Sequence, residues 1–193
     1  MEKDREFHLD MVSVRLVKER PVLSPVKVKD PQTAIQAVGE MLKELDREVL
    51  CVINLKTNGT PINCHIAGIG GLNRAISEPR ELLKASILSN AAQVIIVHNH
   101  VSGDLTPSQY DIQMTDRMAK VCSLVGIPLV DHVIAGGDNR NYFSFREKGI
   151  VNFLPHNCYT NDLQQIQLDR VAERGGDDGR AFYGRGTSDR KER

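Results

Sequence analysis

The alternation of apolar and polar residues predicts an N-terminal arm followed by a helix. Residues 12–16 alternate apolar with polar side chains, which is typical of a strand, and the two prolines within 21–28 indicate an extended connection. The Asp-Pro pair at 30–31 is typical of a helix start. Apolar residues then recur at helical spacing, at Ala34, Ile35, Val38, Met41, Leu42 and Leu45. We therefore expect residues 1–29 to form a strand and an extended arm, and the helix to cover one face of a sheet.

A buried hairpin is predicted next. Residues 49–55 form a nearly continuous apolar run, as in a strand that is buried on both faces. The sequence TNGT at 57–60 contains the Asn-Gly pair that favours a tight hairpin turn. Residues 62–69 are expected to return as the antiparallel partner, so that these two strands open the sheet.

The chain then predicts a second helix that leads into a strand. Ser77 can cap this helix, and Pro79 falls in its first turn. Its inner side is expected to carry Leu82, Leu83, Ile87, Leu88 and Ala91. The apolar run at 94–97 follows as a strand that ends at His98.

A third helix is expected after a polar loop. The sequence TPSQ at 106–109 matches an N-cap, a first-turn proline and a capping-box glutamine, and Gly126 is expected to close the helix. Its apolar residues are Ile112, Met118, Val121 and Val125. Ser108 and Asp111 would then share one face of the first turn, where the helix dipole favours an anionic ligand or transition state.

The remaining pattern completes one domain and leaves a tail. Residues 129–135 and 142–145 are predicted strands, with a glycine pair in the turn between them. A single α/β domain with a mixed sheet is therefore expected over 30–152. Residues 153–193 are rich in Gly, Asp and Arg, which predicts a polar, disordered tail. A short amphipathic helix within 163–171 is the less favoured alternative.

Composition and charge exclude several classes of protein. Lys plus Arg equals Asp plus Glu at 25 each, so the net charge indicates no attraction to nucleic acid or to an anionic membrane. The arginines and glycines of the tail leave a weak nonspecific contact with nucleic acid open. The four cysteines form no CxxC pair and are expected to be reduced thiols. The N-terminus is charged and no apolar window approaches about 18 residues, so we expect a cytoplasmic protein with no membrane partner.

The string HNHVSGDLTPSQYD at 98–111 carries the candidate chemistry. Side chains alternate along a strand, so His98 and His100 point to the same face and can reach one ion together. Asp111 would supply the third ligand. Three protein ligands leave the fourth position of a tetrahedral zinc open for water, whose pKa the metal lowers to about 7. We expect one Zn²⁺ per chain, because this constellation would be costly to bury without a function.

The same string resembles a known family. It matches without a gap the pattern HxH, seven residues, Ser, two residues, Asp, which is the signature of the JAMM (MPN-type) zinc metalloproteases. The flanking segments PRELLKASILSNAAQVIIVHNH and GIPLVDHVIAGG are similar to its bacterial RadC-like branch, over about residues 30–152. Val101 departs from that branch, which usually has proline after the HNH. The resemblance implies an α/β JAMM (MPN, cytidine-deaminase-like) fold, a curved mixed β-sheet flanked by helices, in which His98, His100 and Asp111 hold zinc.

The resemblance also implies roles for residues outside the ligand set. Glu48, just before an early strand, would take a proton from the attacking water, whereas the residues alone leave open a solvated position between helix and strand. Ser108 would stabilise the developing oxyanion, and its alternative is a helix N-terminal hydroxyl bonded to backbone amides. Asp131 and His132 match the RadC-like pattern and would orient a ligand, the alternative being an ordinary polar pair at a strand end.

These residues predict a zinc-dependent metallopeptidase or isopeptidase that hydrolyses an amide bond in a peptide or protein. Zinc deaminases are excluded because neither HxE nor PCxxC occurs, and the HxHxDH motif of metallo-β-lactamases is absent. The alternative is a DNA-repair-associated accessory protein with structural or vestigial zinc, as the RadC label implies. The arm is shorter than the helix-hairpin-helix segment that typical RadC-like proteins carry, which weakens direct DNA binding. The sequence names neither the substrate nor the oligomeric state.

Overall fold

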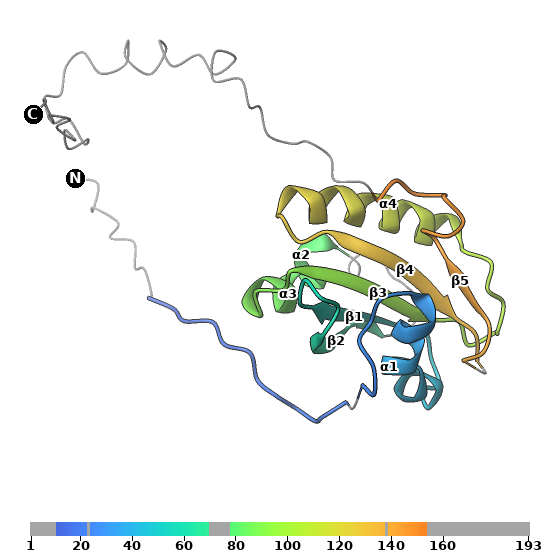
Figure 1. Ribbon diagram of the computed structural model, residues 1–193, viewed down its shortest axis with the longest axis horizontal. Helices are drawn as coiled ribbons and strands as arrows, with labels where there is room; N and C mark the ends of the chain where they lie inside the picture. The colour runs from blue at the N-terminus through green and yellow to red at the C-terminus, as the bar shows by residue number, and fades with distance from the viewer. Residues whose placement is uncertain (1–10, 23, 70–77, 138, 154–193) are drawn as a thin grey trace, which may run out of the picture. The chain divides into compact units, whose positions relative to one another are not determined.

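A five-stranded mixed sheet lies at the centre of the chain (Figure 1). The computed structural model describes residues 11–22, 24–69, 78–137 and 139–153. The strands follow the order β2-β1-β3-β4-β5, and only the β3–β4 pair is parallel. Their bounds are β1 Val49–Leu55, β2 Pro61–Ile69, β3 Gln93–Asn99, β4 Leu129–Ala135 and β5 Tyr142–Ser144. The predicted α/β class and mixed sheet are confirmed.

Helices cover both faces of the sheet, and each face has its own core. Helix α1 lies on one side and α4 on the other (Figure 1). The helices are α1 Pro31–Lys43, α2 Pro79–Leu82, α3 Lys84–Leu88 and α4 Gln109–Leu124. Leu50, Val52 and Ile96 pack with α2 and α4, whereas their strand neighbours Cys51 and Ile53 pack with α1. The alternation of side chains along β1 and β3 therefore divides the residues between two cores.

Helix α1 begins where the sequence predicted. Asp30 is its N-cap: the Oδ1 atom of Asp30 accepts the Thr33 N–H at 2.8 Å, and the Thr33 hydroxyl accepts the Asp30 N–H at 3.1 Å. This capping box satisfies amides that a helix start otherwise leaves unpaired. Four of the predicted inward residues are buried, namely Ala34, Ile35, Val38 and Leu42.

The β1–β2 hairpin also follows the prediction, since every residue of β1 is buried and β2 returns antiparallel to it. Gly59 in the turn has a φ of 79°, a conformation that favours glycine. The Val28 N–H donates to the Gly59 carbonyl at 2.9 Å. A Cβ atom at position 59 would lie 2.6 Å from the Val28 carbonyl oxygen, so the approach of the arm also requires glycine.

The single helix expected after Ser77 is instead two short helices. Helix α2 begins after Glu78 and α3 follows Leu83, while Ser77 lies outside the described residues. The expected inward residues Ile87 and Leu88 are exposed, and Leu82, Leu83 and Ala91 are buried as predicted. The two short helices meet at Leu83, and the apolar spacing read as one helix assigned Ile87 and Leu88 to the buried side although they face solvent.

The strand expected at 12–16 does not form. Residues 11–22 carry no regular secondary structure, and Val12 and Val14 are 79% and 70% exposed. Alternation shows which face a strand would bury but supplies no neighbouring strand to bond with.

The tail and the cysteines were also subjects of expectation. The tail from 154 onward and its alternative helix lie outside the described residues, and Cys51, Cys64 and Cys122 are free thiols, as expected. Among the helices described, none combines the length and apolar character needed to cross a membrane.

Candidate metal centre

The end of β3 presents two histidines toward the start of α4. His98 lies on β3, and His100 follows the strand by one residue. Both rings face Asp111 on α4, because residues two apart on a strand share a face. The side chains of His98 and Asp111 are 0% and 1% exposed, and that of His100 is 11% exposed. The structure thus brings the three residues predicted as ligands into one buried cluster.

Helix α4 begins later than predicted, and the later start makes Asp111 the residue that closes its N-terminal cap. Its N-cap is Ser108 rather than Thr106, whose N–H instead donates to Asp104 Oδ1 at 2.9 Å. Asp111 Oδ2 accepts the Ser108 N–H at 2.8 Å and the Ser108 hydroxyl at 2.6 Å, and the Asp111 N–H donates back to Ser108 Oγ at 3.1 Å. The chain offers two overlapping capping boxes, and the one that closes uses Asp111 in place of the expected Gln109.

The spacing of the three side chains suits a metal ion. His98 Nδ1 lies 3.7 Å from Asp111 Oδ1, and His100 Nε2 lies 3.9 Å from Asp111 Oδ2. One ligand atom from each residue lies within 4.8 Å of the others. Bonds of about 2.0–2.1 Å in a tetrahedral zinc site set neighbouring ligand atoms about 3.3 Å apart. The two histidine-to-carboxylate distances are a few tenths of an ångström wider than this, and the three ligand atoms lie within 4.8 Å of one another, so side-chain rotations that bring them closer would let the cluster hold a metal ion.

The hydrogen bonds leave the ligand atoms available. Both ring nitrogens of His98 and Oδ1 of Asp111 are buried without a hydrogen-bond partner, which is uncommon for polar atoms. His100 Nδ1–H donates to the Asp104 carbonyl, so that His100 Nε2 carries a free lone pair. A cation at the cluster would bind one ring nitrogen of His98 together with Asp111 Oδ1 and His100 Nε2, which leaves the other ring nitrogen of His98 without a partner among the described residues.

The electrostatics favour the ligand form of His98. Burial, together with the nearby His100, lowers the pKa of His98 to about 4, although the Asp111 carboxylate opposes this shift. The imidazole is therefore neutral near pH 7, as metal coordination requires.

Glu48 and Ser108 line the same cavity as these ligands. Glu48 precedes β1, which pairs antiparallel with β3 so that Leu50 lies opposite His98. Glu48 and Leu50 are two residues apart and share a face, which turns Glu48 toward the histidines. The cavity measures about 380 Å³ and is lined by Glu48, His98, His100, Ser102, Asp104, Thr106, Ser108, Tyr110 and Asp111. The structure thus brings to the cluster a carboxylate that is distant in sequence.

Asp131 and His132 point in different directions, so the structure does not bring them together at the site. The Asp131 carboxylate accepts hydrogen bonds from the Ser144 hydroxyl and, at 3.0 Å, from the Arg146 N–H. These bonds fix β5 and the turn that follows it. Asp131 is paired with Ile95, a residue of the core on the α1 side, so it lies away from the ligand cluster. The expectation that Asp131 orients a ligand therefore has no contact to support it.

His132 lies on the same side of the sheet as the ligands. Its ring stacks on His98 with centroids 5.8 Å apart. The Thr115 hydroxyl donates to the Asp111 carbonyl and therefore accepts the His132 Nδ1–H at 2.6 Å. The connection from His132 reaches Asp111 through Thr115, which belongs to no motif recognised in the sequence. Its signal was its position four residues after Asp111, one helical turn along the same face.

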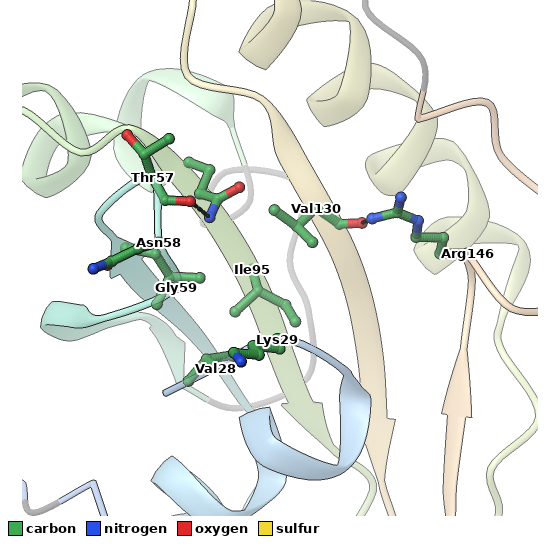
Figure 2. Close-up of a pocket in the computed structure, with 10 residues that line it drawn as sticks. Val28, Lys29, Thr57, Asn58, Gly59, Ile95, Val130 and Arg146 are labelled. Carbon is green, nitrogen blue, oxygen red and sulfur yellow. Dashed lines mark hydrogen bonds between the residues drawn. The ribbon is translucent and has the colours of Figure 1, made fainter. Parts of the chain in front are cut away.

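A second cavity lies at the opposite end of β3 and carries no comparable chemistry. It measures about 370 Å³, and its lining contains no histidine, cysteine or carboxylate. Figure 2 shows Thr57 and Asn58 of the hairpin turn on one side of Ile95 and Arg146 on the other. Arg146 is held by a hydrogen bond of 3.3 Å to the Val130 carbonyl. Of these two cavities, the first is therefore the one that combines histidines with carboxylates.

Comparison with known proteins identifies the family of the chain. A family model described as the RadC-like JAB domain matches residues 28–150. A UPF0758 protein of Desulfitobacterium hafniense is 39% identical over 137 residues, which cover 71% of this chain and 59% of the relative. A UPF0758 protein of Clostridium perfringens is 41% identical over 129 residues, which cover 67% of this chain and 56% of the relative. The chain thus spans less than three fifths of these relatives, and it belongs to the RadC-like JAB domain family, whose wider superfamily includes metallohydrolases.

Proposed function

We propose that this chain is a zinc-dependent metallopeptidase or isopeptidase that hydrolyses an amide bond with an activated water molecule. The observation that supports it most is the shared cavity, in which buried and unpaired ligand atoms of His98 and Asp111 lie beside the carboxylate of Glu48. A zinc ion at the cluster would supply the Lewis acidity that lowers the pKa of water to about 7 and polarises a carbonyl group.

The protein side chains would handle the protons. Glu48 takes a proton from the attacking water as its oxygen bonds to the amide carbon, and it returns that proton to the amine when the carbon–nitrogen bond breaks. Ser108 lines the cavity, and its hydroxyl would stabilise the negative charge that develops on the carbonyl oxygen. In the structure this hydroxyl donates to Asp111 Oδ2, so the role requires it to turn toward the substrate. The neutral His98 and the oriented His100 would hold the ion and take no part in the proton transfers.

The number of ligands favours catalysis over a structural zinc site. Structural zinc sites use four protein ligands, whereas catalytic sites use three and keep one position open. Among the described residues, one cluster of three candidate ligands occurs, and it opens into the cavity. This arrangement disfavours an accessory protein with structural zinc, and the presence of Glu48 in the same cavity disfavours one with vestigial zinc. The substrate class remains part of the proposal, as a peptide or a peptide-tagged protein that presents an amide to this cavity.

The test measures zinc per chain and cleavage of a peptide library for the wild type and for two site variants. We expect His100→Ala to lose both zinc and activity, and Glu48→Gln to keep zinc and lose activity. Glu44→Gln removes the same charge at an exposed position outside the cavity and serves as the matched control, with both properties kept. Stoichiometric zinc in His100→Ala would refute the ligand assignment, and full activity in Glu48→Gln would refute its role as base. Salt-sensitive binding to duplex DNA without metal-dependent cleavage would favour the accessory role.

A further inference from the structure

Asn99 stands between the two histidines but is turned away from the metal cavity. Residues alternate along β3, so its side chain lies on the face opposite His98 and His100. It is nearly buried, at 9% exposed. Buried amide groups are normally paired, and the partners of Asn99 show what it does.

Both hydrogen bonds of the Asn99 side chain go to the backbone beside Glu48. The Oδ1 atom accepts the Val49 N–H at 2.7 Å, and the Nδ2 group donates to the Arg47 carbonyl at 3.1 Å. One bond lies on each side of Glu48 in the sequence. An asparagine side chain suits this task because it carries a donor and an acceptor in one plane, as a peptide group does.

These bonds extend the β1–β3 ladder past its end. The pairing of the two strands finishes at Val49 and Asn99, and Glu48 is the first residue outside β1. The side-chain amide takes the place of the next peptide group of β3, and it holds residues 47–49 against the strand that carries the metal ligands. The position of Glu48 relative to His98 and His100 therefore depends on one side chain located between those histidines.

We propose that Asn99 is a positioning residue for Glu48: by binding the peptide groups on both sides of it, Asn99 sets the distance between the Glu48 carboxylate and the metal ligands. This inference rests on the proposed hydrolytic function. A misplacement of about 1 Å in a catalytic group can cost about 10²-fold in rate. A residue that only stabilised the sheet would lower stability without a selective effect on turnover.

The test compares Asn99→Ala with Asn63→Ala, a matched loss of a side-chain hydrogen bond in the same sheet. Asn63 accepts from the buried Asn54 at 2.6 Å and does not line the cavity. In zinc-loaded protein, Asn99→Ala is expected to lower kcat about 10²-fold with KM changed less than about twofold, and Asn63→Ala to leave both unchanged. Zinc per chain is expected to stay at the wild-type value in both variants. Hydrogen exchange of the Val49 amide is expected to accelerate in Asn99→Ala alone.

A double variant shows whether Asn99 acts through Glu48. If it does, Asn99→Ala added to Glu48→Gln lowers the residual rate no further, because the group that it positions is already disabled. An additive loss would overturn the inference, as would wild-type kcat in Asn99→Ala or a loss of its zinc. A zinc-loaded wild type that cleaves nothing would instead refute the proposed function, and the inference about Asn99 with it.

Discussion

Replacement of Thr115 by valine should show how much the hydrogen bonds of its hydroxyl, which link helix α4 to His132 on β4, contribute to stability. Thr115 is fully buried, and valine has nearly its shape but no hydroxyl. The change removes the acceptor of the His132 Nδ1–H and the donor to the Asp111 carbonyl. Burial, together with the nearby His98 and His100, lowers the pKa of His132 well below its ordinary value, so this ring is neutral at pH 7.5 and carries one N–H.

The loss of stability in Thr115→Val depends on whether the Asp111 carbonyl and the His132 N–H keep or find other hydrogen-bond partners. The Asp111 carbonyl belongs to helix α4 and keeps its backbone hydrogen bond. The His132 N–H finds no new acceptor, and moving the proton to Nε2 gives no relief because that atom is also buried and unpaired among the described residues. An unsatisfied buried donor costs about 1–3 kcal/mol, so we expect Thr115→Val to lower the free energy of unfolding by about 2 kcal/mol.

Equilibrium unfolding of the metal-free protein in urea measures this loss, followed by far-ultraviolet circular dichroism. His132→Phe supplies the control background, since a phenyl ring stacks similarly on Phe145 and has no N–H to satisfy. Removing both polar partners is nearly neutral when shape is kept, so the effect of Thr115→Val should fall below about 0.5 kcal/mol in that background. An equal cost in the two backgrounds would show that the hydrogen bond between Thr115 and His132 does not contribute as described.

Three further predictions concern stability. Gly59→Ala should lower the free energy of unfolding by at least about 1 kcal/mol more than Gly126→Ala. Both glycines have positive φ, but only a Cβ at Gly59 would clash with the Val28 carbonyl. Equal losses in urea unfolding would contradict this. Zn²⁺ at 100 times its Kd should raise the free energy of unfolding by about 2.7 kcal/mol, and a chelator should reverse the gain; no change would argue against binding to the folded state. The pKa of His98 falls from 6.5 to about 4 on folding, so the unfolded chain binds the proton more tightly than the folded one. The free energy of unfolding of the metal-free protein should therefore decrease by about 3 kcal/mol as the pH is lowered from above 6.5 to below 4. His98→Gln should flatten that dependence, and an unchanged slope would show that another group causes it.

The sequence predicted best those elements that local signals alone determine. Buried β1 follows from a continuous apolar run, and the hairpin turn follows from its Asn-Gly pair. The cap of α1 depends only on Asp30 and Thr33, three residues apart, so it could be predicted from the local sequence. The start of α4 was misplaced because two capping boxes overlap, and the choice of Ser108 depends on hydrogen bonds of the loop before it. The alternation at 12–16 was misread because a strand needs a partner, which no local pattern reveals.

The candidate site shows the same division. His98, His100 and Asp111 lie within one short segment, so their meeting could be anticipated from strand alternation and helix position. Asn99 and Thr115 were missed because their partners are backbone groups and a histidine brought close only by the folded sheet. Asp131 was assigned to the site together with its neighbour His132. The two side chains lie on opposite faces of β4, however, and the Asp131 carboxylate binds Ser144 and the Arg146 N–H instead.

The separate origin of Glu48 and of the metal ligands has an evolutionary consequence. The ligands come from β3 and α4, whereas Glu48 comes from the segment before β1 and takes no part in the ligand cluster. A lineage could therefore replace Glu48 in a single mutational step and still keep the three candidate ligands and the fold. If the chain is the zinc hydrolase proposed above, gene duplication could yield inactive scaffolds with the same zinc content as the active protein. Under the proposed mechanism, the residue at position 48 of this chain is a better guide to hydrolysis than the presence of metal.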